Sequence, residues 1–314
     1  MRQRTPRTIE PFPGANVLRP RSMLFTLYGD YAYPRGVDLW LGSLVSIGAR
    51  LGISEAALRS AVARLARDGW LISKRRGSRS YYALSDRGVA LIEEGTARIY
   101  EPRSEPWDGT WCVLTYAIPE SRRAHRDRLR KQLAWLGFGA LGGGTYMSPR
   151  SVGARTAALV QEHGVSEFAR IFSARFQGPI KANEMVRRCW NLSAIARQYA
   201  RFSARYTPFF NIDRKRDRDG SLDDATAFVR RFALTHDFRH FPFIDPDLPR
   251  ELLPKGWAGA RARDLFERYH ALLTNSALRY FSEVATLSAN AINGRSRYAS
   301  VRARIPRSDG TRRR

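Results

Sequence analysis

The sequence has little acid, almost no lysine and very little cysteine. Its 314 residues contain 29 Asp and Glu against 54 Lys and Arg, which leaves a formal net charge of +25. Only five of the basic residues are lysine, so an arginine-rich coding bias is an alternative explanation for much of the surplus. Positive charge favours DNA, RNA or an anionic membrane surface as partner but does not choose among them. The positions of the basic residues along the chain are therefore more informative about the partner than their number.

Long apolar runs are also absent. No segment approaches the roughly 20 apolar residues that cross a membrane, and residues 1–19 lack the apolar core of a signal peptide. We expect a cytoplasmic protein with no membrane partner, and disorder in residues 1–19. The 43% hydrophobic and 11% aromatic residues are sufficient to fold two or three domains.

The two cysteines, Cys112 and Cys189, are distant in sequence and belong to no CxxC motif. A disulfide framework and a cysteine-based zinc site are therefore unsupported, and we expect two buried, reduced thiols. No HExxH or GxSxG motif is present, and neither cysteine has an identifiable base partner. We expect no catalytic residue, no metal site and no cofactor, and hence a protein that is not an enzyme.

The first hundred residues carry a pattern typical of a helix-turn-helix. Apolar residues predict a helix over 21–31, and Asp38 is placed to cap a second helix from Leu39 to about Leu51. The sequence Gly52-Ile53-Ser54 then predicts a sharp break and a new cap before a third helix over 55–68. Helix, short glycine-containing turn and helix are the elements of the motif.

The third predicted helix has a basic face. Leu58, Ala61, Val62 and Leu65 follow helical spacing and form its apolar side. The other faces then present small and basic side chains, Arg59, Ser60, Ala63, Arg64 and Arg67. Arginine can bond guanine edges in a major groove, and small residues allow close approach.

A basic hairpin follows this helix. Residues 71–74, 75–79 and 80–84 are typical of strand, turn and strand, which together would form a wing on the DNA backbone. Ser85 is placed to cap a further helix to about Tyr100, which completes a winged helix-turn-helix domain over 20–103. The alternatives are a solvated amphipathic helix with an ordinary hairpin, and a protein-binding winged helix. The predicted DNA contacts are Ser54, Arg59, Ser60, Arg64, Arg67, Lys74, Arg75, Arg76 and Arg79.

Several short motifs of the chain belong to one pattern, namely RSMLFTLYGDY at 21–31, WLGSL at 40–44, GIS at 52–54, DGWL at 68–71, RSYYALS at 79–85, WDGTW at 107–111, GFG at 137–139 and DPDLP at 245–249. Through these motifs the chain resembles the PaaX family of transcriptional repressors. The resemblance implies a dimeric repressor of an aromatic catabolic pathway. Double-stranded operator DNA would be its partner, and an aromatic acyl-CoA such as phenylacetyl-CoA would release it.

An acyl-CoA effector needs basic groups for its phosphates and an apolar slot for the acyl group. The segment HDFRHF at 236–241 offers both, through His236, Arg239, His240 and neighbouring aromatic residues. A structural polar cluster is the alternative. A metal site is disfavoured because no third ligand is identifiable.

Residues 107–178 predict a ferredoxin-like (split βαβ) central domain. A strand over 111–118, a helix over 122–136, two strands within 140–147, a helix over 152–163 and a strand over 167–173 give its order. The triple glycine 142–144 fits a turn between strands better than a phosphate cradle. The basic cluster over 122–131 is either a solvated helix face or a supplementary DNA contact.

This order resembles the small CRISPR-associated endoribonucleases, in which a carboxylate ends the first strand. Ala117 occupies that position here. A metal-dependent nuclease would therefore lack its central ligand. A nonspecific RNA-binding protein is the other alternative, and gross charge alone favours it.

The remaining chain predicts a helical C-terminal domain over 179–296. Helical patterns cover 182–205 and 259–291, and an apolar stripe on the second could bury within the domain or in a two-fold dimer. Residues 297–314 form a basic tail that we expect to be disordered. The predicted fold class is thus α+β, with a winged helix-turn-helix, a ferredoxin-like domain and a helical domain.

Overall fold

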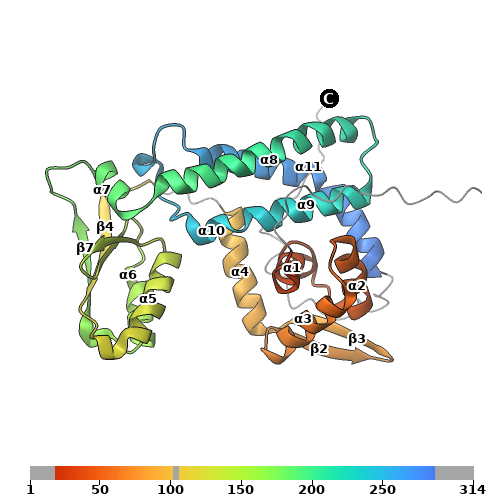
Figure 1. Cartoon of the computed structure of the whole chain (residues 1–314), viewed down its shortest axis with the longest axis horizontal. Coiled ribbons are helices and arrows are strands. Elements are labelled where there is room, and N and C mark those ends of the chain that lie inside the picture. Colours follow the sequence, from red (N-terminus) through yellow and green to blue (C-terminus); the bar gives the residue numbers. More distant parts are fainter. Residues whose placement is uncertain (1–17, 102–105, 287–314) are drawn as a thin grey trace, which may run out of the picture. The chain divides into compact units, whose positions relative to one another are not determined.

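The computed structural model describes residues 18–101 and 106–286. The chain divides into two compact units. The first combines the residues up to Tyr100 with Tyr206–Asp237 and the chain from Phe266, and the second combines Glu101–Arg205 with Phe238–Leu265. Helices and two antiparallel sheets make the fold α+β, as predicted (Figure 1). The disorder predicted for residues 1–19 and 297–314 lies outside the described residues, except at residues 18 and 19, which precede α1 without regular structure.

The N-terminal part of the first unit surrounds a small sheet with strand order β1-β3-β2. Its elements are α1 (Pro20–Leu27), the π-helical turn η1 (Tyr28–Ala32), the 3-10 turn η2 (Tyr33–Arg35), β1 (Leu39–Trp40), α2 (Leu41–Arg50), α3 (Glu55–Arg67), β2 (Leu71–Arg76), β3 (Arg79–Leu84) and α4 (Asp86–Tyr100). Helix, turn, helix and hairpin therefore follow one another from α2 to β3.

The turn between α2 and α3 has the chemistry that the sequence predicts. Gly52 has a left-handed φ of 78°, and the N–H of Ile53 returns to the carbonyl of Gly48 at 2.8 Å. Ile53 is buried, and the Ser54 hydroxyl accepts from the N–H of Ala57 to cap α3. The predicted break and cap are confirmed.

The β2–β3 hairpin is longer than predicted. Its strands pair from Leu71 opposite Leu84 out to Arg76 opposite Arg79, so the turn is Gly77-Ser78 and not the five residues 75–79. Gly77 has a φ of 58°, as the first central residue of a two-residue hairpin turn often requires. Because successive residues of a strand point to opposite faces, the basic residues of the hairpin divide between its two faces.

The predicted start of the second helix is wrong. Leu39 and Trp40 pair with β3 as a short strand, and α2 begins at Leu41 with no side-chain cap. Asp38 therefore does not cap the helix. Its carboxylate lies beside basic side chains of β2, an attraction between distant parts of the sequence that local pattern does not reveal.

The first predicted helix is also not uniform. Regular α-helix ends at Leu27, and the π-helical turn that follows buries both Asp30 and Tyr31. Tyr31 packs against Phe228 and Phe281 of the C-terminal helices, with ring centroids 5.0 and 5.3 Å away. The N-terminal elements and these helices therefore share one core.

The C-terminal helices of the chain are long. They are α8 (Leu192–Arg218), α9 (Asp224–Phe238) and α11 (Ala258–Thr286). The first unit contains α8 from Tyr206, α9 up to Asp237 and α11 from Phe266. The helix predicted over 259–291 is confirmed up to Thr286, beyond which it lies outside the described residues. The helix predicted over 182–205 is two helices, because the chain turns at Trp190 between α7 (Ala182–Cys189) and α8.

The second unit contains a four-stranded sheet of order β5-β6-β4-β7. Its elements are β4 (Thr110–Tyr116), η3 (Glu120–Arg122), α5 (Arg123–Trp135), β5 (Gly139–Gly142), β6 (Thr145–Ser148), α6 (Gly153–Glu162), η4 (Ser166–Phe168), β7 (Ala169–Arg175), α7, α10 (Phe241–Ile244) and η5 (Arg250–Leu252). Buried residues of α5, α6 and the sheet form its core, among them Leu114, Leu129, Leu133 and Val160. The triple glycine lies at the turn between β5 and β6, as predicted.

Both cysteines are free thiols, but only Cys112 is buried, and Cys189 is half-exposed. Partial burial nevertheless raises the pKa of Cys189 to about 11.

Within the described residues, none of the helices is both long and apolar enough to cross a membrane.

Candidate nucleic-acid interface

Helix α3 presents a basic face to solvent. Leu58, Val62 and Leu65 are at most 2% exposed and hold the helix on its core. The predicted contact residues on its other faces are all exposed, namely Arg59, Ser60, Arg64 and Arg67. The helix thus combines a rigid apolar attachment with a polar surface that could enter a groove.

The arginines of α3 differ in their surroundings. Arg59 forms an ion pair with Glu55 one turn earlier, at 2.6 Å. Arg64 and Arg67 form no ion pair or hydrogen bond with any other described side chain. Arg64 is therefore the better candidate for direct contact with a base edge. Ser54 is exposed, but its hydroxyl is already engaged in the cap.

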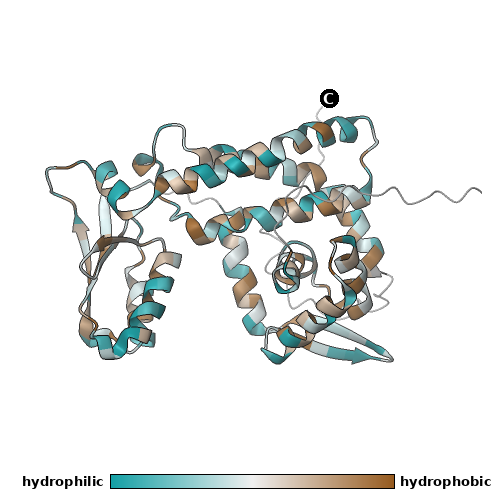
Figure 2. Cartoon of the chain, in the orientation of Figure 1, coloured by the Kyte–Doolittle hydropathy of each residue, from teal (hydrophilic) through white to brown (hydrophobic). Residues whose placement is uncertain are grey.

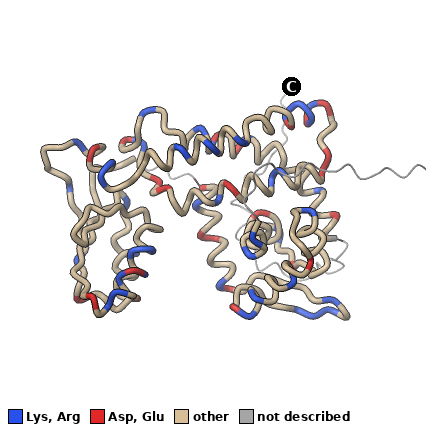
Figure 3. Tube along the Cα trace, viewed as in Figure 1, with Lys and Arg blue, Asp and Glu red and all other residues tan. Residues whose placement is uncertain are grey.

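The basic residues of the hairpin lie mainly on one face. Lys74 Nζ and Arg76 Nη2 donate to Asp38 Oδ2 at 3.1 and 3.2 Å. The guanidinium of Arg79 stacks on the ring of Trp40, 4.7 Å from its centroid. Figure 3 shows the resulting run of basic residues along the hairpin, which Figure 2 shows to be largely hydrophilic.

Arg75 is the hairpin cation on the opposite face, because it alternates with its neighbours along β2. Its Nε donates to the carbonyl of Gly77 in the turn, and the side chain is exposed. The hairpin therefore offers Arg75 on one face and a group of cations held by Asp38 and Trp40 on the other.

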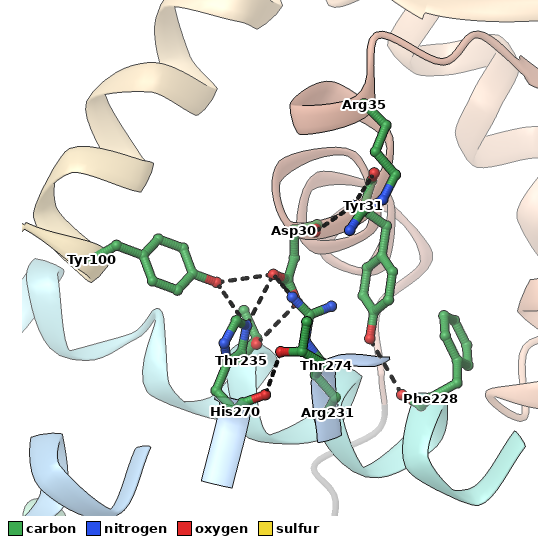
Figure 4. Close-up of polar contacts among 9 residues, drawn as sticks. All are labelled: Asp30, Tyr31, Arg35, Tyr100, Phe228, Arg231, Thr235, His270 and Thr274. Atoms are coloured by element: carbon green, nitrogen blue, oxygen red, sulfur yellow. Dashed lines mark hydrogen bonds and ion pairs between the residues drawn. The ribbon is translucent and has the colours of Figure 1, made fainter. Parts of the chain in front are cut away.

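A buried polar cluster lies between η1 and the C-terminal helices of the first unit (Figure 4). The Asp30 carboxylate accepts from Arg231 Nη2 at 2.8 Å, Tyr100 OH at 3.0 Å, His270 Nε2 at 3.1 Å and Thr235 Oγ1 at 3.1 Å. These donors come from α9, α4 and α11. Asp30 in η1 is thus one of the points where the N-terminal elements bond to the C-terminal helices of the same unit.

The electrostatics of this cluster favour an ion pair. Burial alone would raise the pKa of Asp30, but the charge of Arg231 and the hydrogen bonds from His270 and Tyr100 outweigh it and hold that pKa below its ordinary value. Burial, together with Arg231, lowers the pKa of His270, so its imidazole is neutral. The cluster is consequently an Asp–Arg pair satisfied by neutral donors.

Sequence reasoning missed Asp30, Arg231 and His270. A signal was present, because Asp30 interrupts an apolar helical stretch and Arg231 lies between Phe228 and Phe232. A charged residue in such a stretch is either exposed or buried against a partner of opposite charge, and only the tertiary structure decides between these outcomes.

The predicted effector residues lie in the last turn of α9 and in the two residues that follow it. The His236 ring is half-buried and bonds Thr26 of α1 through Nδ1 at 2.8 Å. Arg239 is half-buried, and burial lowers its pKa, whereas His240 is exposed. His236 belongs to the first unit, and the other two belong to the second.

The position that a nuclease would need offers no ligand. Ala117 follows β4, and its N–H bonds the carbonyl of Phe168 in the turn before β7. A methyl side chain there cannot bind a metal ion. In residues 18–101 and 106–286, no group of three or more His, Cys, Asp or Glu side chains is arranged to hold one.

Comparison with known proteins shows to which family this chain belongs. Family models described as PaaX-like protein, PaaX protein central Cas2-like domain and PaaX-like protein C-terminal domain match residues 19–88, 104–186 and 190–283. The chain is 34% identical over 266 residues to the transcriptional repressor PaaX of Escherichia coli (strain K12), covering 83% of each chain. The chain belongs to the PaaX family. The resemblance in the sequence is thereby confirmed, and the chain is a member of a family of regulators and not of enzymes.

A solved structure shares the fold. It is the uncharacterized protein Rv0674 from Mycobacterium tuberculosis, 24% identical, with a TM-score of 0.54 over 85% of this chain and all of that one. In this PaaX-family chain, Asp30 lies in the first matched segment, whereas Arg231, Thr235 and His270 lie in the third. The buried cluster therefore joins two segments that are separate in sequence.

Proposed function

We propose that this PaaX-family chain is a sequence-specific DNA-binding transcriptional repressor of an aromatic catabolic pathway. The observation that carries the proposal is the basic, exposed face of α3, presented by a capped helix-turn-helix and followed directly by a basic hairpin. This order is that of a winged helix-turn-helix. The name of the Escherichia coli relative supports repression.

The two basic elements would have different tasks. Helix α3 would enter the major groove, with Arg64 at base edges and Ser54, Arg59, Ser60 and Arg67 at bases or phosphates. The hairpin would contact the sugar-phosphate backbone or the minor groove through Lys74, Arg75, Arg76 and Arg79. The proposed DNA-binding domain spans residues 20–103.

An aromatic acyl-CoA such as phenylacetyl-CoA would release the repressor. Its phosphates need basic groups and its acyl group an apolar slot, for which we propose His236, Arg239 and His240 with the aromatic residues around them. The ferredoxin-like central domain (107–178) and the helical domain (179–296) would carry this response.

The repressor would act as a two-fold homodimer on a palindromic operator. DNase I footprinting of the DNA upstream of its own gene tests both points. We expect protection of two half-sites whose centres lie about one helical turn, roughly 10 base pairs, or a multiple of it apart. Diffuse protection along the whole fragment would contradict sequence-specific binding.

A further inference from the structure

Asp38 is an acidic residue beside the cations of the β2–β3 hairpin. Its side chain is only 14% exposed, and its Oδ2 lies 3.1 Å from Lys74 Nζ and 3.2 Å from Arg76 Nη2. It does not cap α2, so helix capping does not explain its position. Two of the four cations of the hairpin thus share one carboxylate.

A carboxylate in this position weakens attraction to a phosphate in two ways. It neutralises part of the charge that Lys74 and Arg76 would present, and it repels the phosphate directly. Contacts to phosphate are independent of base sequence and supply nearly all of nonspecific binding. Arg64 of α3 forms no ion pair with a carboxylate of the described residues, so the arginine proposed to read bases keeps its charge.

We propose that Asp38 is a specificity-determining residue that restrains binding of the hairpin to DNA of any sequence. This inference rests on the proposed function of the α3 and hairpin surface. The carboxylate lowers affinity for nonspecific DNA more than affinity for the operator, because operator binding also draws on base contacts from α3. Tight binding therefore requires base contacts between α3 and the operator sequence.

The test compares the full-length wild type with Asp38→Asn, which removes the charge and keeps the shape. Fluorescence anisotropy gives Kd for an operator duplex and a scrambled duplex between 50 and 200 mM salt. In Asp38→Asn, Lys74 and Arg76 no longer face a carboxylate, and together they should gain about one phosphate contact. The plot of log K against log salt concentration for scrambled DNA then becomes steeper by about 0.9. Between 50 and 200 mM salt, the variant therefore loses about 3.5-fold more affinity than the wild type. At the low-salt end, we expect Asp38→Asn to bind the scrambled duplex several-fold more tightly and to show a smaller operator preference.

Two control variants separate charge from structure. Asp38→Glu keeps the charge and should retain the wild-type preference. Asp219→Asn changes net charge equally at the end of α8, away from the hairpin in the same unit, and should leave both affinities nearly unchanged (Figure 1). A thermodynamic cycle with Arg76→Ala adds a second readout, because the loss caused by Arg76→Ala on scrambled DNA should be larger when Asp38 is Asn.

The outcomes are distinct. If the wild type prefers its operator but Asp38→Asn binds scrambled DNA no more tightly, or Arg76→Ala costs the same in both backgrounds, the role of Asp38 is overturned while the proposed function stands. If the wild type binds both duplexes equally, the proposed function is overturned, and the role of Asp38 with it.

Discussion

At the scale of single residues, Arg64 and Arg75 separate base reading from backbone binding. We expect Arg64→Ala to weaken operator binding by about 1–3 kcal/mol and scrambled binding much less, because Arg64 is an exposed cation without an ion pair among the described residues, on the helix proposed to enter the groove. Arg75→Ala should weaken binding to both duplexes similarly and reduce the salt slope by about 1. Anisotropy titrations of both variants on both duplexes measure this. Equal losses for the two variants on the two duplexes would contradict the assignment.

Asp30 is the buried counter-ion of Arg231 in the first unit, so the stability of that unit should depend on it. In Asp30→Asn the buried charge of Arg231 loses its counter-ion, so we expect the free energy of unfolding to fall by about 3–5 kcal/mol. Urea unfolding followed by circular dichroism measures this loss. The double variant Asp30→Asn with Arg231→Met should recover much of it, because no unpaired charge remains. A single variant within about 1 kcal/mol of wild type would show that the ion pair is not needed.

At the scale of elements, the joint between η1, α4, α9 and α11 should make stability depend on pH. The lowered pKa of His270 keeps the imidazole neutral in the folded protein, whereas the unfolded chain takes up a proton near pH 6.5. Stability from this residue is thus present above about pH 6.5 and is lost as pH falls. The lowered pKa of Asp30 acts in the same direction, but only below about pH 4.

The variant His270→Gln tests this joint, because the amide can still donate to Asp30 but does not titrate. Between about pH 6.5 and 5, a single proton can contribute a slope of at most about 1.4 kcal/mol per pH unit. We expect the stability of the wild type to fall more steeply over this range than that of His270→Gln, measured by urea unfolding at each pH. If the stabilities of the wild type and of His270→Gln fell equally with pH, groups other than His270 would cause the loss.

The elements that the sequence predicts well are those with local signals. Gly52 and Ser54 set the turn and cap between α2 and α3, and helical spacing places Leu58 and Leu65 inside. The predicted order of strands and helices in the second unit agrees with the structure to within a few residues, because each strand is bounded by glycine, proline or a helix start.

The elements that local signals do not reveal depend on tertiary contacts. The strand Leu39–Trp40 forms because β3 lies beside it, and Asp38 is attracted to cations more than 30 positions away. The π-helical turn buries Asp30 against a counter-ion, Arg231, that lies 201 positions later. Pattern and propensity describe neighbours in sequence, so they could not predict either contact.

At the scale of the whole molecule, binding of the proposed effector should stabilise the protein. We expect phenylacetyl-CoA to raise Tm, whereas phenylacetate or coenzyme A alone raises it less, because only the thioester offers both the acyl group and the phosphates. A ligand present at 100 times its Kd adds about 2.7 kcal/mol. A thermal-shift series with the three compounds measures this. An equal rise with coenzyme A alone would show that the aromatic acyl group is not recognised.

The central claim is that this chain selects a DNA sequence through α3. The most direct measurement is the ratio of Kd values for a duplex from its own promoter and for the same duplex scrambled, taken by anisotropy at physiological salt. We expect at least a thousandfold preference for the promoter duplex, the lower end of the range for specific regulators. A ratio near one would mean that the basic surface binds DNA without distinguishing base sequences, and would contradict sequence-specific binding through α3.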